Sequence, residues 1–257
     1  MPMSYFVYCS IEIVMAFLGL ICFFVLYFIP AGYGKFIDKK WGFSFSNKPA
    51  WTLMELPALI VMIHLLYILD YAHKPVRILL ASFFIVHYTQ RTFIFPILLK
   101  GKSNMPLIIV LMGMLFNTVN ALLIGLWIFY FSPVEMYDKH WLTDPRFIIG
   151  TVLFFTGMCI NLQSDAYIRS LRTSGDTKHY YPYRGLYRYI TSANYFGELV
   201  EWLGFAVLTW SFAGCLFVFW TACNLVPRSH TIYKKYADSF PEELSRYKPK
   251  RIIPFLY

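Results

Sequence analysis

Two apolar segments of this chain carry polar and charged side chains at helical intervals. The first set is Asn161, Asp165, Arg169 and Arg172, and the second is Asn194, Glu198 and Glu201. Intervals of four, seven, eight and eleven residues place each set on one face of a helix. An ionised group in the middle of a bilayer costs about 2.5–3.5 kcal/mol on insertion scales, so these sets indicate a charged ligand or an internal network. Charges wetted at helix ends are the simpler alternative.

The chemistry of these side chains suits a dinucleotide. The guanidinium groups of Arg169 and Arg172 can bind phosphates in a bidentate manner, and Lys102 can add a point charge on the same side. The carboxylates and amides can bind ribose hydroxyls and a carboxamide. The sequence has no Gly-x-Gly-x-x-Gly motif after a strand, so the predicted site is not a Rossmann site. Asp165 and Arg169, four residues apart, could instead form a salt bridge within a helix.

A second group of polar residues lies in earlier apolar segments. Glu55 stands near the start of one of them, where it could be a helix-terminal charge or a buried group that shares a proton with a substrate oxygen. Tyr88 and Arg91 lie on one face of the next segment, with His87 beside them. A lone tyrosine in such a segment could also be a packing residue with a satisfied hydroxyl group.

The composition is that of an integral membrane protein. Of 257 residues, 58% are hydrophobic and only 14% are charged, which leaves too little polar surface for a soluble globule. Apolar runs long enough to span a bilayer occur at 6–29, 51–69, 76–99, 106–131, 146–163, 194–210 and 211–227. The first run lacks the basic start and cleavage site of a signal peptide, so it stays as a helix. We therefore predict an all-α, polytopic seven-helix transmembrane bundle without strands.

The predicted bundle is one domain, residues 1–257, with two halves of different character. Residues 1–145 hold four spans and form the expected substrate-binding half. Residues 146–257 hold three spans and a basic cytoplasmic tail, and form the expected nucleotide-binding half. A transporter would also tolerate intramembrane charges, but the sequence has neither an internal repeat nor paired broken helices.

Basic residues predict the orientation of the chain. With the amino terminus outside or in a lumen, the inside segments hold 18 of the 23 basic residues. The outside loops then hold four, which are Lys74, Arg77, Lys139 and Arg146. The positive-inside rule therefore places the carboxyl terminus in the cytoplasm. The net charge of +9 is explained by this asymmetry, so no nucleic-acid partner is expected.

Metal ligation is not predicted. The five cysteines and six histidines are scattered without the spacing of a metal site. No obligate protein partner is evident from the sequence either. The expected partners are membrane lipid and a small lipid substrate.

Seven motifs give the chain a resemblance to the steroid 5α-reductases (3-oxo-5α-steroid 4-dehydrogenases) over nearly its whole length. They are Tyr33-Gly-Lys35, Trp51-x-x-x-Glu55-Leu-Pro57, His87-Tyr88-x-x-Arg91-Thr-Phe93, Gly157-Met-x-Ile-Asn161-x-x-x-Asp165, Leu171-Arg172, Ser192-x-Asn194-Tyr-x-Gly-Glu198-x-x-Glu201-Trp202 and Ile253-Pro254-Phe255. The sixth motif also resembles polyprenol reductases and enoyl-CoA reductases of lipid synthesis. Glu55 and Tyr88 favour the steroid-reductase branch.

The resemblance implies an enzyme that uses NADPH to reduce the Δ4 double bond of a 3-oxo-steroid, with hydride at C5 and a proton at C4. It implies that Glu55 and Tyr88 are catalytic and bind the 3-oxo group, with Trp51 as a further substrate contact. The cofactor site implied in the same way comprises Tyr33, Arg91, Lys102, Asn161, Asp165, Arg172, Asn194, Glu198, His230 and Tyr233. The polar faces described above add Arg169 and Glu201 to it.

Two departures from the family pattern affect this cofactor site. Lys102 stands where the resemblance leads us to expect an arginine, and His230 and Tyr233 match only with a shifted alignment.

The alternative enzymes are a reductase of another lipid enone or enal, such as a polyprenal or an enoyl-CoA, and an isoprenylcysteine-type methyltransferase that binds S-adenosylmethionine.

Overall fold

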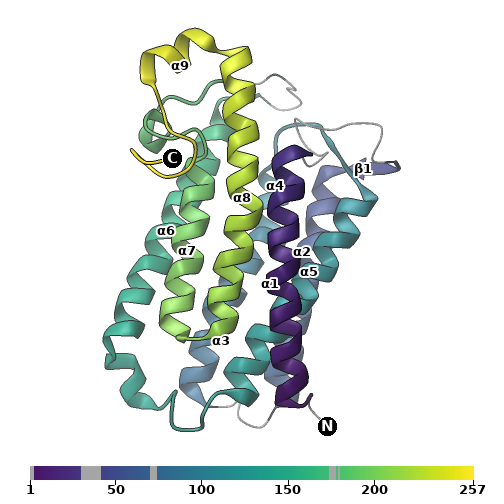
Figure 1. Ribbon diagram of the computed structural model, residues 1–257, viewed down its shortest axis with the longest axis vertical. Helices are drawn as coiled ribbons and strands as arrows, with labels where there is room; N and C mark the ends of the chain where they lie inside the picture. The colour runs from purple at the N-terminus through teal and green to yellow at the C-terminus, as the bar shows by residue number, and fades with distance from the viewer. Residues whose placement is uncertain (1–2, 30–41, 70–73, 174–177, 179) are drawn as a thin grey trace.

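Long helices that alternate in direction build the protein. A computed structural model describes residues 3–29, 42–69, 74–173, 178 and 180–257. Its long helices are α1 (Tyr5–Phe28), α2 (Asn47–Ile68), α3 (Pro75–Thr89), α5 (Leu107–Leu126), α6 (Pro145–Ser170), α7 (Ala193–Thr209) and α8 (Phe212–Ser239). The described amino terminus and the carboxyl terminus lie at opposite ends of the bundle (Figure 1). The predicted all-α architecture is confirmed.

Shorter elements extend or connect these helices. A π-helical segment, η4 (Gln90–Ile94), joins α3 to α4 (Phe95–Leu98), and a second, η5 (Trp127–Phe131), continues α5. The remaining short helices are η6 (Lys139–Thr143), η7 (Gly185–Arg188) and α9 (Pro241–Tyr247).

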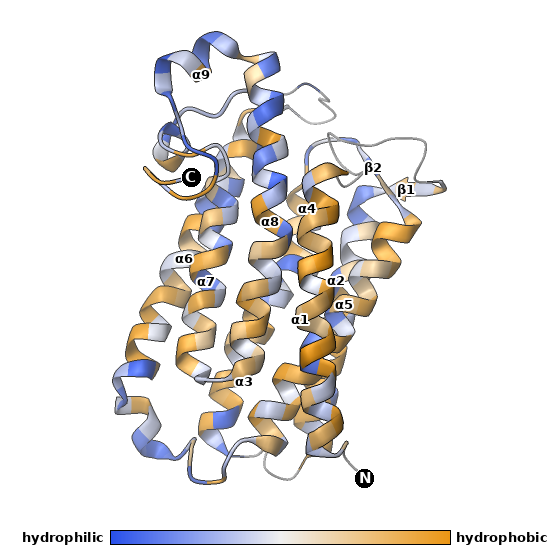
Figure 2. Ribbon diagram, viewed as in Figure 1, coloured by the Kyte–Doolittle hydropathy of each residue, from blue (hydrophilic) through white to orange (hydrophobic). Residues whose placement is uncertain are grey.

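Within the described residues, five helical segments have the length and composition of membrane spans. They are Tyr5–Phe28, Asn47–Ile68, Pro75–Leu98, Leu107–Phe131 and Pro145–Ser170. The last two predicted spans coincide with α7 and the first part of α8, which pack against α6 and α1 respectively. Apolar residues dominate the length of the bundle, and hydrophilic residues gather at its two ends (Figure 2). The count of seven spans remains a prediction.

The prediction that the chain has no strands is wrong for six residues. Strands β1 (Ser44–Ser46) and β2 (Asn104–Pro106) form a two-stranded antiparallel ribbon, with Phe45 opposite Met105. The ribbon lies beyond the helix ends, in the connections before α2 and before α5 (Figure 1). Each strand satisfies backbone groups of the other there, so the argument against isolated strands in lipid does not apply.

Arg77 also differs from its expected place in an outside loop. It lies in α3 and is almost fully buried. Its guanidinium group donates to the carbonyl oxygen of Pro133 at 2.9 Å and to the Ile128 carbonyl and the Ser132 hydroxyl group. The side chain thereby holds the end of η5 against α3. It is a structural cation and not a topology signal.

Glycines bring α6 and α7 into backbone contact. A Cβ atom on Gly157 would stand 2.2 Å from the backbone nitrogen of Glu201, and one on Gly197 would stand 2.5 Å from the backbone nitrogen of Asn161. Helices in membranes commonly approach through such small residues. This close approach places the polar face of α6 directly against that of α7.

Candidate active site

One asparagine links the two predicted catalytic residues. Nδ2 of Asn117 donates to Oε2 of Glu55 at 3.0 Å, and the Tyr88 hydroxyl group donates to Oδ1 of Asn117 at 3.0 Å. The Asn117 amide also donates to the Met54 carbonyl at 2.8 Å. All three side chains are buried, and they come from α2, α3 and α5. Glu55 lies well inside α2, so it is not a helix-terminal charge.

Sequence reasoning missed Asn117. The signal was present, because Asn117 and Asn120 are amides one helical turn apart in the otherwise apolar segment Leu107–Leu126. Polar side chains in a membrane helix usually face the bundle interior and are usually functional. Both asparagines are indeed buried.

Arg91 lies between this group and the second polar group. Its Nη1 atom is 3.8 Å from Oδ2 of Asp165, and its charge also interacts with the carboxylates of Glu55 and Glu198. The guanidinium carbon stands 4.4 Å from the Phe95 ring centroid. Arg91 belongs to the π-helical segment η4, a rare conformation that is frequent at functional sites.

Trp51 packs beside Arg91. The Arg91 guanidinium carbon is 5.0 Å from the Trp51 ring centroid, and the Trp51 and Phe95 rings meet edge to face at 5.3 Å. Trp51 lies one turn before Glu55 on α2. The expected contact of Trp51 with substrate stays a prediction, since the contact that the structure shows for its ring is with Arg91.

The second polar group joins α6, α7 and the segment before α7. Nδ2 of Asn161 donates to the Asn194 backbone carbonyl at 3.0 Å, and Nδ2 of Asn194 donates to Oδ1 of Asp165 at 3.0 Å. The Tyr187 hydroxyl group donates to Oδ1 of Asn194 at 3.3 Å. Asp165 therefore has Arg91 and Asn194 as its partners, and the alternative of a salt bridge to Arg169 is not formed.

Tyr187 was also missed from the sequence. It lies in η7, outside the apolar segments, and no spacing rule connects it to α7. Burial raises the pKa of Tyr187 well above its ordinary value, so its hydroxyl group remains a donor at physiological pH.

Glu198 and Glu201 have different surroundings on α7. The carboxylate of Glu201 is buried and pairs with Nδ1 of His87 at 2.7 Å, which ties α7 to α3. Glu198 is half-buried, and it forms no hydrogen bond or ion pair with any residue that the structure describes. Its carboxylate interacts with the charge of Arg91, the cation between the two polar groups.

The predicted phosphate-binding cations lie at the end of the bundle that holds the carboxyl terminus. Nη1 of Arg169 is buried and has no hydrogen-bond partner among the described residues. Arg172 follows α6, and its backbone carbonyl accepts from Nζ of Lys100 at 3.1 Å. Lys102 is exposed between α4 and β2. The elements that carry these cations share one end of the molecule (Figure 1).

The last predicted cofactor residues lie on α8 beyond the apolar run 211–227. The His230 ring stacks on that of Tyr27, with centroids 4.7 Å apart, and burial lowers the pKa of His230, with a further contribution from Lys234. Because its pKa is lowered, the His230 imidazole is neutral at physiological pH. The Arg251 guanidinium carbon stands 5.3 Å from the Tyr233 ring centroid. Tyr33, the remaining predicted residue, lies outside the described residues.

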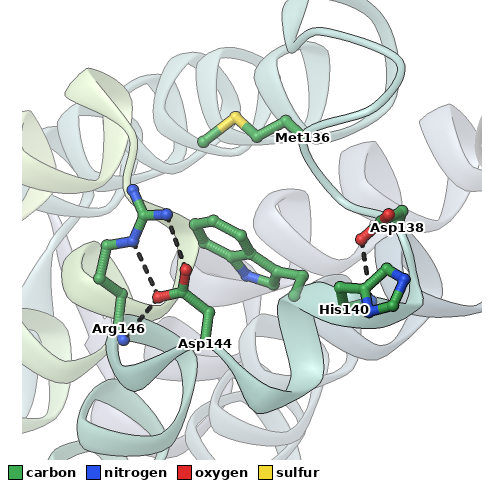
Figure 3. Close-up of a pocket in the computed structure, with 6 residues that line it drawn as sticks. Met136, Asp138, His140, Asp144 and Arg146 are labelled. Atoms are coloured by element: carbon green, nitrogen blue, oxygen red, sulfur yellow. Dashed lines mark hydrogen bonds and ion pairs between the residues drawn. The ribbon is translucent and has the colours of Figure 1, made fainter.

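Two surface hollows lie away from these groups. The first, of about 290 Å³, lies at the opposite end of the bundle, before α6 (Figure 3). It is lined by Met136, Asp138, His140, Trp141, Asp144 and Arg146. The second, of about 580 Å³, is apolar and lies between the end of α1 and the chain after α9. Neither is lined by a residue predicted to be part of the site.

Asp144, which lines the first hollow, accepts three hydrogen bonds from Arg146. Its carboxylate accepts from the backbone nitrogen, Nε and Nη2 of Arg146 at 2.8, 2.9 and 2.8 Å, and so caps the first turn of α6 (Figure 3). These hydrogen bonds lower the pKa of Asp144 to about 2. The hollow is thus a structural feature of the α6 start.

Comparison with known proteins shows to which family the chain is similar. The family described as 3-oxo-5-alpha-steroid 4-dehydrogenase matches residues 103–257. The chain is 37% identical to 3-oxo-5-alpha-steroid 4-dehydrogenase 1 of Bos taurus over 93% of both chains. It is 42% identical to the Homo sapiens protein of that description, over 82% of this chain and 80% of that protein. It is 35% identical to Steroid 5-alpha-reductase DET2 of Arabidopsis thaliana over 99% and 97% of the two chains.

Proposed function

Because the chain belongs to the 3-oxo-5-alpha-steroid 4-dehydrogenase family, we propose that it reduces the Δ4 double bond of a 3-oxo-steroid with NADPH as the reductant. The observation that carries this proposal is the Glu55–Asn117–Tyr88 group, which buries two hydrogen-bonding side chains suited to a carbonyl oxygen. Bound NADPH would supply a hydride to C5 of the steroid.

The proton-bearing groups of this site would act on the 3-oxo oxygen. Negative charge develops on that oxygen as the enone is reduced, and a preorganised donor in a dry site stabilises it strongly. The Tyr88 hydroxyl group, which donates to Oδ1 of Asn117, would turn to the steroid oxygen. Glu55, held by the Asn117 amide, would share a second proton with that oxygen.

The second polar group would hold the nucleotide. A cofactor with phosphates, ribose hydroxyls and a carboxamide needs cations, carboxylates and amides together. The α6–α7 face offers these groups. Nη1 of Arg169, which has no hydrogen-bond partner among the described residues, and the half-buried carboxylate of Glu198 fit such a ligand. We assign Arg91, Asn161, Asp165, Arg172 and Asn194 to the same site, with Lys102, Glu201, His230, Tyr233 and Tyr33 as further candidates.

Arg91 provides a physical link between the proposed steroid-binding half and the proposed nucleotide-binding half. It reaches Asp165 in the nucleotide half and interacts with Glu55 in the substrate half. A cation between the two groups would bring the nicotinamide end of the nucleotide close to the enone. The two halves, 1–145 and 146–257, would therefore meet at Arg91.

Competing activities are separated by one assay. The family match favours the reductase over a transporter or an isoprenylcysteine-type methyltransferase. Purified protein in detergent should consume NADPH with testosterone or progesterone, and the product should have lost the Δ4 double bond. Consumption with a polyprenal alone would place the activity in another branch of lipid reductases. Binding of S-adenosylmethionine in place of NADPH would contradict the proposal.

A further inference from the structure

Two successive residues of α7 contact the turn of α3 that carries Tyr88. Oε1 of Glu201 and Nδ1 of His87 are 2.7 Å apart, and both side chains are almost fully buried. The ring of Trp202 packs on that of His87 with centroids 4.4 Å apart, and its centroid is 6.1 Å from that of the Tyr88 ring. These contacts join α7 to α3 beside a proposed catalytic residue, and the proposed reaction gives His87 no role so far.

The hydrogen bond between His87 and Glu201 fixes the position of the imidazole ring. A carboxylate only accepts hydrogen bonds, so Nδ1 of His87 carries the hydrogen and donates it. That bond determines the tautomer and the orientation of the ring. A buried pair of this kind stabilises a fold little more than apolar side chains of the same volume do. Its effect is therefore geometric, because it holds one point of α3 against one point of α7.

The point on α7 is itself held by its neighbours. A Cβ atom on Gly157 of α6 would stand 2.2 Å from the backbone nitrogen of Glu201 and 2.6 Å from its Cα atom. The ring of Trp202 packs on that of Phe217 of α8, with centroids 4.1 Å apart. Because α6 leaves α7 no room to move closer at this point, Glu201 is a fixed reference for α3.

The helix geometry changes directly after this point of α3. The π-helical segment η4 begins at Gln90, two residues after Tyr88, and the Gln90 backbone nitrogen donates to the His87 carbonyl. A π-helical turn holds one residue more than an α-helical turn, so the angle between Tyr88 and the side chains of η4 depends on where the change begins. The bond from His87 to Glu201 holds the chain at this junction.

Arg91 holds the other side of the same junction. It belongs to η4, and its Nη1 atom is 3.8 Å from Oδ2 of Asp165 on α6. Helix α7 thus holds the chain before Tyr88 through His87, and α6 holds the chain after it through Arg91. The Tyr88 hydroxyl group, between these two points, donates to Asn117 of α5. The two helices of the proposed nucleotide-binding half therefore determine where Tyr88 lies.

We propose that His87 is a positioning residue, whose bond to Glu201 holds the Tyr88 hydroxyl group in the place where it meets the enone oxygen. This inference rests on the proposed function. The effect of a hydrogen-bond donor on turnover depends on its geometry, and a displacement of about 1 Å can cost about 10²-fold in rate. His87 acts through Tyr88 and transfers no proton, so its loss affects turnover and not the binding of steroid or nucleotide.

The test is His87→Phe, alone and combined with Tyr88→Phe. The substitution removes the bond to Glu201 and keeps a ring that can pack on Trp202. We expect kcat for a Δ4-3-oxo-steroid to fall by about 10-fold or more, with an unchanged steroid KM and unchanged NADPH-induced thermal stabilisation. In the Tyr88→Phe background there is no hydroxyl group to position, so His87→Phe should lower kcat by less than about twofold further. Equal falls in the two backgrounds, or a change confined to KM, overturn the inference alone.

A second substitution separates positioning from folding. His87→Phe takes away the partner of a buried carboxylate, so the melting temperature should fall. Adding Glu201→Met replaces both partners with apolar side chains, so the melting temperature should recover. The kcat at saturating NADPH should stay low, because Tyr88 still lacks its reference. A kcat that returns to the wild-type value together with the melting temperature overturns the inference, since folding alone then explains the loss.

A conservative variant and a structural control complete the test. His87→Asn keeps an amide nitrogen near the position of Nδ1 and should have a higher kcat than His87→Phe. Tyr137→Phe removes a buried hydrogen bond to the Thr209 carbonyl, at the last residue of α7, and should leave kcat unchanged. A kcat of His87→Asn no higher than that of His87→Phe, or an equal loss in Tyr137→Phe, overturns the inference. A wild-type protein without Δ4 reduction overturns the proposed function and the inference together.

Discussion

The hydroxyl group of Tyr88 and the carboxyl group of Glu55 are joined through a single side chain, because the two ends of the Asn117 amide bind one each at 3.0 Å. Helices α3 and α2 therefore present their functional groups in an arrangement that α5 determines. The site is preassembled, and its integrity depends on a residue that would itself do no chemistry.

Asn117→Leu tests this dependence. The substitution removes three hydrogen bonds and leaves two buried polar groups unsatisfied, at about 1–3 kcal/mol for each. We expect a lower melting temperature and a loss of steroid turnover, measured by thermal unfolding and by NADPH consumption. Thr118→Val is the matched control, since the Thr118 hydroxyl group bonds, among the described residues, only to its own helix at Met114. Equal effects of the two variants would contradict the bridging role of Asn117.

The cations at the end of α6 predict a preference for NADPH over NADH. Arg169 and Arg172 can bind the extra phosphate of NADPH, and Nη1 of Arg169 has no hydrogen-bond partner among the residues that the structure describes. Arg172→Ala should weaken NADPH binding strongly and NADH binding much less, as measured by ligand-dependent thermal stabilisation. Arg188→Ala, which removes an exposed cation from the neighbouring segment, should have no effect. Equal affinity of the wild-type protein for both nucleotides would refute the assignment.

The Asp144–Arg146 contact predicts a stability change with pH. Hydrogen bonds from Arg146 lower the pKa of Asp144 from 3.8 to about 2 in the folded protein. The stabilisation is complete above the unfolded pKa and is lost as pH falls through the folded value. The melting temperature of Asp144→Asn should lie below that of the wild type by a constant amount from neutral pH to about pH 5, and the gap should narrow below about pH 4. A difference in melting temperature between the wild type and Asp144→Asn that widens in acid would contradict the lowered pKa of Asp144.

The charge asymmetry predicts a cytoplasmic carboxyl terminus. Single cysteines introduced at Lys248 or Lys250 should react with a membrane-impermeant maleimide only after the membrane is opened. A cysteine introduced at Lys139, at the opposite end of the bundle, should react in intact cells or sealed vesicles. The reverse pattern would overturn the orientation and the access of NADPH from the cytoplasm.

Long apolar runs made the helices predictable from the sequence. Each of the seven runs matched a long helix of the described chain. Helix α6 continues to Ser170 and α8 to Ser239, beyond the predicted runs, because polar and charged side chains in these extensions interrupt the apolar signal. The ribbon of β1 and β2 was missed, because three-residue strands have too few positions for a period to show.

The polar sets were predictable on each helix, but their partners were not. The sequence places Asp165 one turn from Arg169, whereas the fold pairs it with Arg91 and Asn194. That choice depends on how α6 approaches α7 through Gly157 and Gly197, a packing relationship that periodicity does not contain. Tyr187 was missed for a similar reason, since it reaches Asn194 from the short helix η7, outside the long apolar helices.

The central claim is that Glu55 and Tyr88 act on the enone oxygen and not on the nucleotide, and paired measurements on Glu55→Gln and Tyr88→Phe test it most directly. Steroid turnover should fall by about 10²-fold or more, on the order of 3 kcal/mol, as for the loss of one oxyanion-stabilising donor. NADPH-induced thermal stabilisation should remain close to that of the wild type. Tyr67→Phe, at a position of α2 that is 83% exposed, should change neither quantity. Full Δ4-reductase activity in either catalytic-site variant, or loss of NADPH binding together with activity, would contradict the division between a steroid-binding half and a nucleotide-binding half.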